Sequence, residues 1–463
     1  MNRLIALSFI IILSLTFAVS CKQDSSRQSE KNQEPVLNKV RTININSDST
    51  QSYSLYLPTS YNPNDRFPAV FLFDPHANGR LPVDKLRKKA EELGYILIGS
   101  NNSRNGADNL TYICQSLIQD ALNKFRIDRN RIFAGGFSGG ARVAGSVLPQ
   151  ITRVQSVFSC GAGLMQAIQL IKKKNLTYLG IIGEQDFNYR EAIQTHQVFN
   201  QKGIENHLLS FQGGHEWPPD SILSKSLDWF ECQSMKNNPK NVSEDWLNTF
   251  YKKQINKAEF LAKNKNKLES YHQYRWVYAC VKDLLSTKKL TKRIQKLKNS
   301  PEIARYYQQR NQLLQQEQRL YNQYIQAYMH RDTEWWKREI NEYEKKISQT
   351  SNPQQKNFLI RLKNYWSMAG FSLTSNALEK DQIEKARHTT DIYQMVDPEN
   401  PDVYYLKAKL FALTGNQEQA MEHLKKAADK GFEDWDRIRK DSIFIKTLQN
   451  KKLKPLINSE KQL

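Results

Sequence analysis

Short apolar runs, each followed by a polar turn, dominate residues 39–235 of the 463-residue chain. Four of them have the length and composition of buried strands: Pro68–Phe73, Arg131–Gly135, Leu176–Gly183 and His207–Phe211. Stretches with helical spacing lie between the runs, for example from Tyr189 to about Lys202. Buried strands that alternate with helices are typical of a parallel sheet covered on both faces. We therefore predict an α/β domain over residues 39–235.

The hydrophobic pattern becomes helical after a polar linker at Met235–Lys240. From Glu244 to Tyr343, apolar residues recur with the spacing of one helix face, and glycine becomes scarce. Such a pattern indicates amphipathic helices that pack on one another or on a neighbouring domain. We predict an all-helical stem over residues 236–366.

A 34-residue repeat follows, because Glu384 and Ala386 recur as Glu418 and Ala420. Small residues fall where paired helices would touch, and larger ones lie between them, as in tetratricopeptide repeats. Isolated repeats cannot bury their own faces, so these helices must pack on the preceding ones or on the α/β domain. We predict about two tetratricopeptide-like repeats over residues 367–463.

Residues 1–20 have the order of a secretory signal peptide, with a basic start and an apolar core from Leu4 to Phe17. The core is shorter than a membrane-spanning helix needs. The small residues Ala18, Val19 and Ser20 precede Cys21 and resemble the cleavage box of bacterial lipoproteins, in which the cysteine receives lipid. The alternative is an ordinary cleaved signal with an incidental cysteine.

Lys22 follows this cysteine, where lipoproteins held at the inner membrane commonly carry aspartate. We therefore expect an exported protein whose N-terminal lipid on Cys21 anchors it in the outer membrane, facing the periplasm or the cell surface. Residues 21–38 are mostly polar and lack periodicity, which predicts a flexible tether.

Charge is uneven along the chain, since residues 236–463 contribute +16 of the formal net charge of +21. A basic helical region with interleaved aromatic residues is also found in nucleic-acid-binding proteins. However, the chain has no recognition-helix or RNA-binding signature, and export argues against a nucleic-acid partner. We expect either a solvated helix surface or a partner protein or anionic envelope component, such as lipid headgroups, lipopolysaccharide phosphates or acidic polysaccharide.

Lipidation of Cys21 would leave four cysteines: Cys114, Cys160, Cys232 and Cys280. An exported compartment permits disulfides, and four cysteines allow three pairings between which the sequence does not choose. Two of them, Cys114 and Cys280, lie on predicted helix faces, where buried free cysteine is common. The chain has no Cys-x-x-Cys pair or His/Cys cluster, so we predict no structural metal site.

The strongest chemical signal is the segment Gly136-Phe-Ser-Gly-Gly140, between the strand Arg131–Gly135 and the helix-like stretch Ala141–Leu148. Strand, tight G-x-S-x-G turn and helix together form the context in which a serine becomes an exposed nucleophile. Glycines flank the serine because the turn is too sharp for bulkier residues. We assign Ser138 as a candidate nucleophile at a helix N-terminus.

Two further side chains follow the third and fourth predicted strands, namely Asp186 and His215. Because the carboxyl ends of parallel strands lie at one edge of a sheet, both side chains should meet Ser138 there. His215 would accept the serine proton, and Asp186 would orient the imidazole and stabilise its charged form. Glu184 is close enough in sequence to be an alternative acid.

With these motifs, residues from about 40 to 235 resemble the α/β-hydrolase superfamily, and within it polyhydroxybutyrate-depolymerase-like and feruloyl-esterase-like enzymes. The resemblance rests on the order Ser, Asp, His and on the stretches Asp128–Gly140, Gly183–Asp186 and Gly213–Pro219. It implies an α/β-hydrolase sheet with flanking helices. It also implies a serine carboxylesterase-type hydrolase that needs no metal or cofactor.

The resemblance implies an oxyanion hole as well, with the backbone N–H of Gly139 as one donor. The second donor would come from the loop after Pro68–Phe73, where many relatives carry His-Gly and this chain carries Asp74 and Pro75. Because proline has no N–H, we place the second donor on His76, with Ala77 as the alternative.

We expect a serine hydrolase of the cell envelope that cleaves a carboxylic ester through an acyl-enzyme. The stretch between the Ser138 helix and Asp186 is short, which predicts an open site able to admit an ester carried on a polymer, unless the carboxyl-terminal helices roof it. The alternatives are a serine peptidase and a lipid-anchored interaction protein with an idle hydrolase domain. An idle domain has no need of serine, acid and base at three strand ends, which favours the enzyme.

Overall fold

The computed structural model describes residues 36–238, 240, 242–432 and 434–444. The predicted signal peptide at 1–20, the lipid site at Cys21, most of the predicted tether at 21–38 and the end of the predicted repeat region lie outside the described residues. No helix in the described part is both long and apolar enough to cross a membrane.

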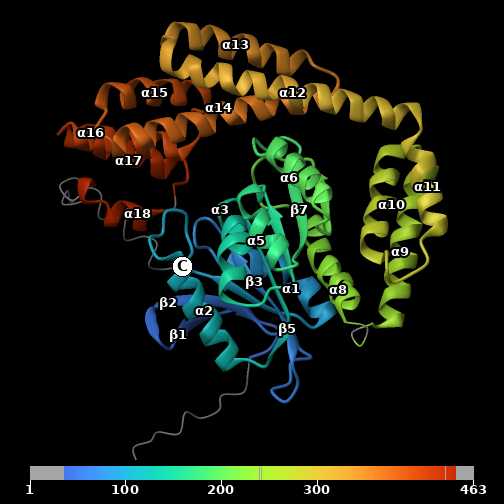
Figure 1. Cartoon of the computed structure of the whole chain (residues 1–463). Helices are drawn as coiled ribbons and strands as arrows, with labels where there is room; N and C mark the ends of the chain where they lie inside the picture. The colour runs from blue at the N-terminus through green and yellow to red at the C-terminus, as the bar shows by residue number, and fades with distance from the viewer. Residues whose placement is uncertain (1–35, 239, 241, 433, 445–463) are drawn as a thin grey trace, which may run out of the picture. The chain divides into compact units, whose positions relative to one another are not determined.

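An eight-stranded sheet organises the first half of the chain, in the order β1-β2-β4-β3-β5-β6-β7-β8 (Figure 1). β2 runs antiparallel to β1 and β4, whereas all later neighbours pair in parallel. The strands are β1 Arg41–Ile45, β2 Asp48–Tyr56, β3 Phe67–Phe73, β4 Ile96–Ser100, β5 Ile127–Phe137, β6 Ser156–Cys160, β7 Thr177–Gly183 and β8 Asn206–Phe211. The predicted α/β class is confirmed: a mostly parallel eight-stranded sheet with flanking helices is followed, in the described residues, by an all-helical region.

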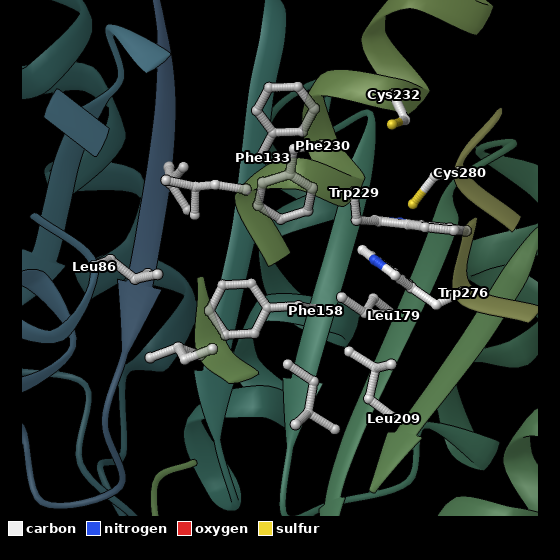
Figure 2. Close-up of a cluster of buried hydrophobic side chains, with 14 of the residues drawn as sticks. Leu86, Phe133, Phe158, Leu179, Leu209, Trp229, Phe230, Cys232, Trp276 and Cys280 are labelled. Atoms are coloured by element: carbon white, nitrogen blue, oxygen red, sulfur yellow. The ribbon is translucent and has the colours of Figure 1, made fainter. Parts of the chain in front are cut away.

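Helices cover both faces of the sheet, as the near-continuous apolar strands require. On one face, Phe133 and Phe158 of the strands pack against Leu86 of α1 and Phe230 of α8, and the rings of Phe133 and Phe230 stack 4.5 Å apart (Figure 2). The helices of the first half are α1 Arg80–Leu93, α2 Leu110–Lys124, α3 Gly139–Arg142, α4 Leu148–Ile151, α5 Ile168–Lys173, α6 Tyr189–Gln201, α7 Asp220–Leu223 and α8 Lys225–Asn237. A separate apolar cluster fills the opposite face.

The described residues from 242 onward, which we call the helical half, consist of helices and the turns that connect them. Its helices are α9 Glu244–Lys263, α10 Lys267–Val281, α11 Lys288–Lys298, α12 Pro301–His330, α13 Thr333–Gln349, α14 Pro353–Glu379, α15 Ile383–Val396, α16 Pro401–Leu413, α17 Gln417–Asp429 and α18 Trp435–Lys440. Two of them begin at Asn-Pro pairs, where the Asn352 or Asn400 side chain accepts a backbone N–H and proline occupies the first helical position.

The 34-residue repeat corresponds to successive helix pairs. α15 and α17 begin at Ile383 and Gln417, which are 34 positions apart, and each pairs with the helix before it. Ala386 and Ala420, the equivalent small residues, are completely buried. The small side chains therefore lie where the helices are close, whereas membership of the tetratricopeptide class stays a prediction.

The boundary between the two halves is not a simple exposed linker. α8 continues to Asn237, and Met235, where the sequence suggests that the linker begins, is buried. Trp276 of α10 belongs to the same apolar cluster as Trp229 of α8, with ring centroids 6.3 Å apart (Figure 2). The helical half thus completes the packing of one face of the sheet domain.

The four described cysteines, Cys114, Cys160, Cys232 and Cys280, are all free thiols and all buried. Cys232 and Cys280 are neighbours, one on α8 and one on α10 (Figure 2). Burial raises the pKa of the Cys280 thiol well above its ordinary value, and the adjacent Cys232 thiol adds to this rise. The Cys280 thiol is therefore a protonated packing group at neutral pH.

Candidate active site

Ser138 occupies a strained turn between β5 and α3. Its φ is +51° and its ψ is −118°, a combination that a residue with a side chain rarely adopts. The backbone N–H of Ser138 donates to the Cys160 carbonyl at 2.8 Å, which continues the pairing of β5 with β6 beyond the last residue of the strand. Neighbouring structure therefore holds the serine in a conformation that places it at the carboxyl end of the sheet.

The two glycines of the motif make this turn possible. A Cβ on Gly136 would lie 2.5 Å from both the Gly140 carbonyl carbon and the Phe73 carbonyl oxygen. A Cβ on Gly140 would lie only 2.2 Å from that same Phe73 oxygen. The turn thus packs backbone to backbone against the end of β3, and any side chain at 136 or 140 would force it apart.

Asp186 is fully buried in the turn after β7. One carboxylate oxygen accepts the backbone N–H of Asn188 at 2.8 Å, and the other lies 2.9 Å from Nδ1 of His215. Burial raises the pKa of Asp186 above its ordinary value, and the hydrogen bonds with His215 and Asn188 oppose that rise. These partners compensate the carboxylate for the water it has lost.

His215 lies in the loop between β8 and α7 and joins the other two residues. Its Nδ1 faces Asp186, and its Nε2 lies 2.9 Å from Oγ of Ser138. The rings of Phe137 and Phe187 flank the imidazole, with centroids 4.7 and 4.3 Å away. The three side chains predicted from strand ends therefore meet in one hydrogen-bonded row.

Glu184, the alternative acid, lies in the same turn but faces other partners. Its carboxylate accepts the Ser210 hydroxyl at 3.1 Å and the amide groups of Gln212 and Asn357 at 2.6 and 2.9 Å. Asp186, and not Glu184, contacts the histidine. Of the two acids that the sequence left open, Asp186 therefore has the position from which a carboxylate could orient the histidine.

The loop after β3 forms a tight turn around the Asp74 carboxylate. Asp74 is buried and accepts the backbone N–H of His76 at 2.8 Å, while the Ala77 N–H donates to the Asp74 carbonyl at 3.1 Å. The side chain of His76 extends into solvent. Both backbone groups that the sequence proposes as a second oxyanion donor therefore already have acceptors in this structure.

Two residues that the sequence analysis did not single out also belong to this region. Trp217, two positions after His215, donates its indole N–H to Asp74 at 2.8 Å and connects the histidine loop to the β3 loop. The side chain of Asn105 lies where a Cβ on Gly139 would lie, with its Oδ1 only 1.7 Å from that position. Trp217 lies in the stretch Gly213–Pro219, on which the family resemblance rests in part, whereas no sequence pattern pointed to Asn105.

Within the described residues, no group of three or more His, Cys, Asp or Glu side chains is arranged to hold a metal ion. The row Ser138, His215 and Asp186 contains a hydroxyl, an imidazole and a buried carboxylate in the order that a proton transfer requires. Chemically, it is able to activate a serine hydroxyl without any further group.

Comparisons with known proteins find similarity in structure only. No family model matches the chain, and no curated protein matches it. Among solved structures, it is similar to an S-formylglutathione hydrolase from Staphylococcus aureus, with 15% identity, 42% of this chain and 98% of that chain covered, and a TM-score of 0.35. It is also similar to a ferulic acid esterase, at 15% identity, with 42% of this chain and 96% of that chain covered and a TM-score of 0.33. A third similar structure is an esterase from Pyrobaculum calidifontis, at 14% identity, with 43% of this chain and 87% of that chain covered and a TM-score of 0.34. These matches cover less than half of this chain.

Proposed function

We propose that the protein is a serine hydrolase that cleaves carboxylic esters through an acyl-enzyme on Ser138. The observation that carries the proposal is the imidazole of His215, which lies 2.9 Å from the serine oxygen on one side and 2.9 Å from the Asp186 carboxylate on the other. The contact between Ser138 and His215 does not follow from local chain geometry, because the two residues are 77 positions apart in the sequence.

In the first step, Oγ of Ser138 attacks the ester carbonyl carbon while Nε2 of His215 takes its proton. Asp186 keeps the imidazole in the required tautomer and stabilises its positive charge. The tetrahedral intermediate then collapses, and Nε2 returns the proton to the leaving alcohol. Water repeats the sequence on the acyl-enzyme and releases the acid.

The oxyanion requires backbone donors, and the N–H of Gly139 at the start of α3 is the first. His76 remains our proposal for the second donor, with Ala77 as the alternative. Since the His76 N–H is held by the Asp74 carboxylate, this role requires the oxyanion to share that donor or the turn to release it.

The substrate in this proposal is an ester that approaches past the β3 and β4 loops, and an ester carried on a polymer remains part of it. Arg104, next to Asn105 in the β4 loop, lies 3.7 Å from Asp434, which precedes α18. This contact favours an entrance bordered by carboxyl-terminal helices over a fully open one. A serine peptidase would use the same three residues. Only a comparison of ester and amide substrates therefore distinguishes an esterase from a peptidase.

The experiment compares hydrolysis of p-nitrophenyl acyl esters and of p-nitroanilide amides by the wild type and Ser138→Ala. We expect ester turnover with an initial burst of p-nitrophenol from the wild type, and a rate at the uncatalysed level from Ser138→Ala. Preference for the anilides would favour the peptidase. Equal rates for both proteins, or no turnover of either substrate class, would favour the idle-domain alternative.

We also propose that the chain is exported and anchored in the outer membrane by lipid on Cys21, and that its basic helical half faces a partner protein or an anionic envelope component. Support comes from the signal-like first 20 residues and from the +16 charge of residues 236–463. Radiolabelled palmitate should enter the wild type in bacterial cells but not Cys21→Ala. Equal incorporation into both would rule the anchor out.

A further inference from the structure

The turn that carries the proposed catalytic acid is held from two sides. We call residues Glu184–Phe187 the acid turn. On the first side, backbone N–H groups of the acid turn donate to the end of β8 and to the loop that carries His215. The Glu184 N–H donates to the Phe211 carbonyl at 2.8 Å, and the Gln185 N–H donates to the Gly213 carbonyl at 2.9 Å. The acid turn and the His215 loop are thereby joined by backbone hydrogen bonds.

On the second side, side chains of the helical half bond to the carbonyl groups of the acid turn. Arg361 of α14 donates to the Glu184 carbonyl at 2.7 Å, and Asn364 of α14 donates to the Gln185 carbonyl at 2.9 Å. The hydroxyl oxygen of Tyr321, on α12, lies 3.1 Å from the Phe187 carbonyl oxygen and shares its proton with that carbonyl. The residues directly before and after Asp186 are therefore both fixed by helices more than 100 positions away in sequence.

The donors are themselves firmly placed. Arg361 and Glu317 form a buried ion pair. Nε of Arg361 lies 3.1 Å from each carboxylate oxygen of Glu317, and Nη2 lies 2.7 Å from Oε2. The single proton of the Tyr321 hydroxyl is shared between the Phe187 carbonyl and the same Glu317 carboxylate, which lies closer at 2.8 Å. The Arg361 guanidinium lies 4.5 Å from the centre of the Tyr189 ring. A buried ion pair contributes little net stability, but its planar geometry fixes where the remaining donor points.

We infer that α12 and α14 set the position of Asp186 through Arg361, Asn364 and Tyr321, so that the helical half is needed for catalysis itself. The inference rests on the proposed function. Asp186 can orient His215 only while its carboxylate stays at hydrogen-bond distance, and a displacement of about 1 Å far from the reacting atoms is able to lower a rate about 100-fold. Arg361, Asn364 and Tyr321 touch no substrate; they are positioning residues that act through Asp186.

The test uses the two least disruptive changes, Asn364→Ala and Tyr321→Phe, in the full chain. Asn364→Ala removes one hydrogen bond to the acid turn. Tyr321→Phe removes the shared contact with Phe187 together with the bond to Glu317, and it preserves the ring that stacks on Tyr365. Tyr328→Phe is the matched control, because Tyr328 is also a buried tyrosine of α12 whose hydroxyl donates to a backbone carbonyl, that of Trp366, outside the acid turn. Melting temperatures and near-ultraviolet circular dichroism establish that all three variants are folded.

We expect Asn364→Ala and Tyr321→Phe to lower kcat for ester hydrolysis by about 10-fold each, within the loss that small displacements cause, and to leave KM within about twofold. Tyr328→Phe should retain the wild-type kcat despite a similar loss of stability. In an Asp186→Ala background, Asn364→Ala should lower the residual rate no further, because a residue that acts through Asp186 has nothing left to position.

Two outcomes would overturn the inference while leaving the proposed function intact. The first is a kcat for both variants no lower than that of Tyr328→Phe. The second is the same fold-loss from Asn364→Ala whether or not Asp186 is present, which would indicate a general structural effect. If instead the wild type hydrolyses esters no faster than Ser138→Ala, the proposed function itself fails.

Discussion

At the scale of single residues, the site depends on a serine whose backbone is strained and on a histidine that contacts one of two available acids. The positive φ of Ser138 persists because Gly136 and Gly140 let the turn pack directly on β3. The carboxylate of Asp186 faces the imidazole, and that of Glu184 faces three other polar groups. Both features lead to predictions about individual substitutions.

Asp186→Asn preserves the shape of the acid but removes its charge and presents the wrong partner to Nδ1 of His215. We predict a fall in kcat of about 10⁴-fold with little change in KM, as expected when the histidine loses its correct tautomer. Steady-state kinetics on an activated ester measures both constants. Glu184→Gln is the comparison, and a larger loss from it than from Asp186→Asn would mean that the acid is misassigned.

Gly140→Ala adds a methyl group that would lie 2.2 Å from the Phe73 carbonyl oxygen. Because the atom it meets belongs to the backbone of β3, the turn itself must move. We predict loss of both stability and ester hydrolysis, read from thermal unfolding and initial rates. Gly203→Ala, in a loop where a Cβ would meet nothing within 4 Å, controls for glycine replacement as such, although its φ of +69° adds some strain. Full activity in Gly140→Ala would show that the close approach to β3 is unnecessary.

At the scale of elements, the apolar pattern located four strands, β3, β5, β7 and β8, and did not name β1, β2, β4 and β6. β3 and β8 begin one residue before the predicted runs, whereas β5 continues to Phe137 because that residue pairs with Cys160 of β6. The helix after Ser138 is interrupted by a π-helical segment at Val143–Val147. Pairing partners and helix irregularities depend on neighbouring elements, so a local pattern does not contain them.

Three histidines at the meeting of α6, β8 and α10, of which His207 is buried and His196 and His272 are half-buried, give the fold a pH dependence. Burial, together with the nearby positive charges of Arg275 and Arg310, lowers the pKa of His196 and of His272 from 6.5 to about 4, and at His196 a hydrogen bond with Asn206 opposes this fall. Burial also lowers the pKa of His207 well below its ordinary value. Since these values lie below the unfolded-state value, the unfolded chain binds more protons between about pH 6.5 and 4.

The contribution of these histidines to stability is therefore complete above about pH 6.5 and is lost as the pH falls toward 4. Each group contributes a slope of up to about 1.4 kcal/mol per pH unit in that window. Urea unfolding at several pH values measures the slope, and His272→Gln should reduce it. A free energy of unfolding that stays constant from pH 7 to pH 5 would contradict this prediction.

At the scale of the whole molecule, the two halves are more interdependent than their sequence patterns suggest. Trp276 of the helical half lies in the same buried cluster as Trp229, and the acid turn takes three hydrogen bonds from α12 and α14. A chain ending at Asn238 would expose Trp229 and Met235, which are now buried. One face of the sheet domain therefore depends on the helical half for its cover, whereas the cluster on the other face lies within residues 37–204.

We predict that a truncated chain of residues 36–238 lacks fixed tertiary structure, as judged by near-ultraviolet circular dichroism and cooperative unfolding. In the full chain, Trp276→Ala should lower the free energy of unfolding by about 3–5 kcal/mol, the cost of an unfilled core site. A truncated chain that unfolds cooperatively at the wild-type temperature would mean that the helical half adds nothing to the core.

The sequence predicted the sheet and the three residues of the row because both follow from local patterns: apolar runs and the polar residues at their ends. It did not predict Arg361, which is 177 positions from its acceptor. That acceptor is a backbone carbonyl, which every residue possesses, so no residue type in the acid turn reveals the contact. The sequence also did not predict that the His76 N–H donates to the Asp74 carboxylate. The two residues are close in sequence, but only the turn that the chain forms there brings the two groups together.

The central claim is that Ser138 is a nucleophile activated by His215. The most direct measurement is peptide mass spectrometry of the protein after treatment with a fluorophosphonate, which forms a covalent adduct only with an activated serine. Our account predicts one adduct, on the peptide that contains Ser138, and its loss in His215→Ala. An adduct on another serine, or equal labelling of Ser138 in the wild type and in His215→Ala, would contradict it.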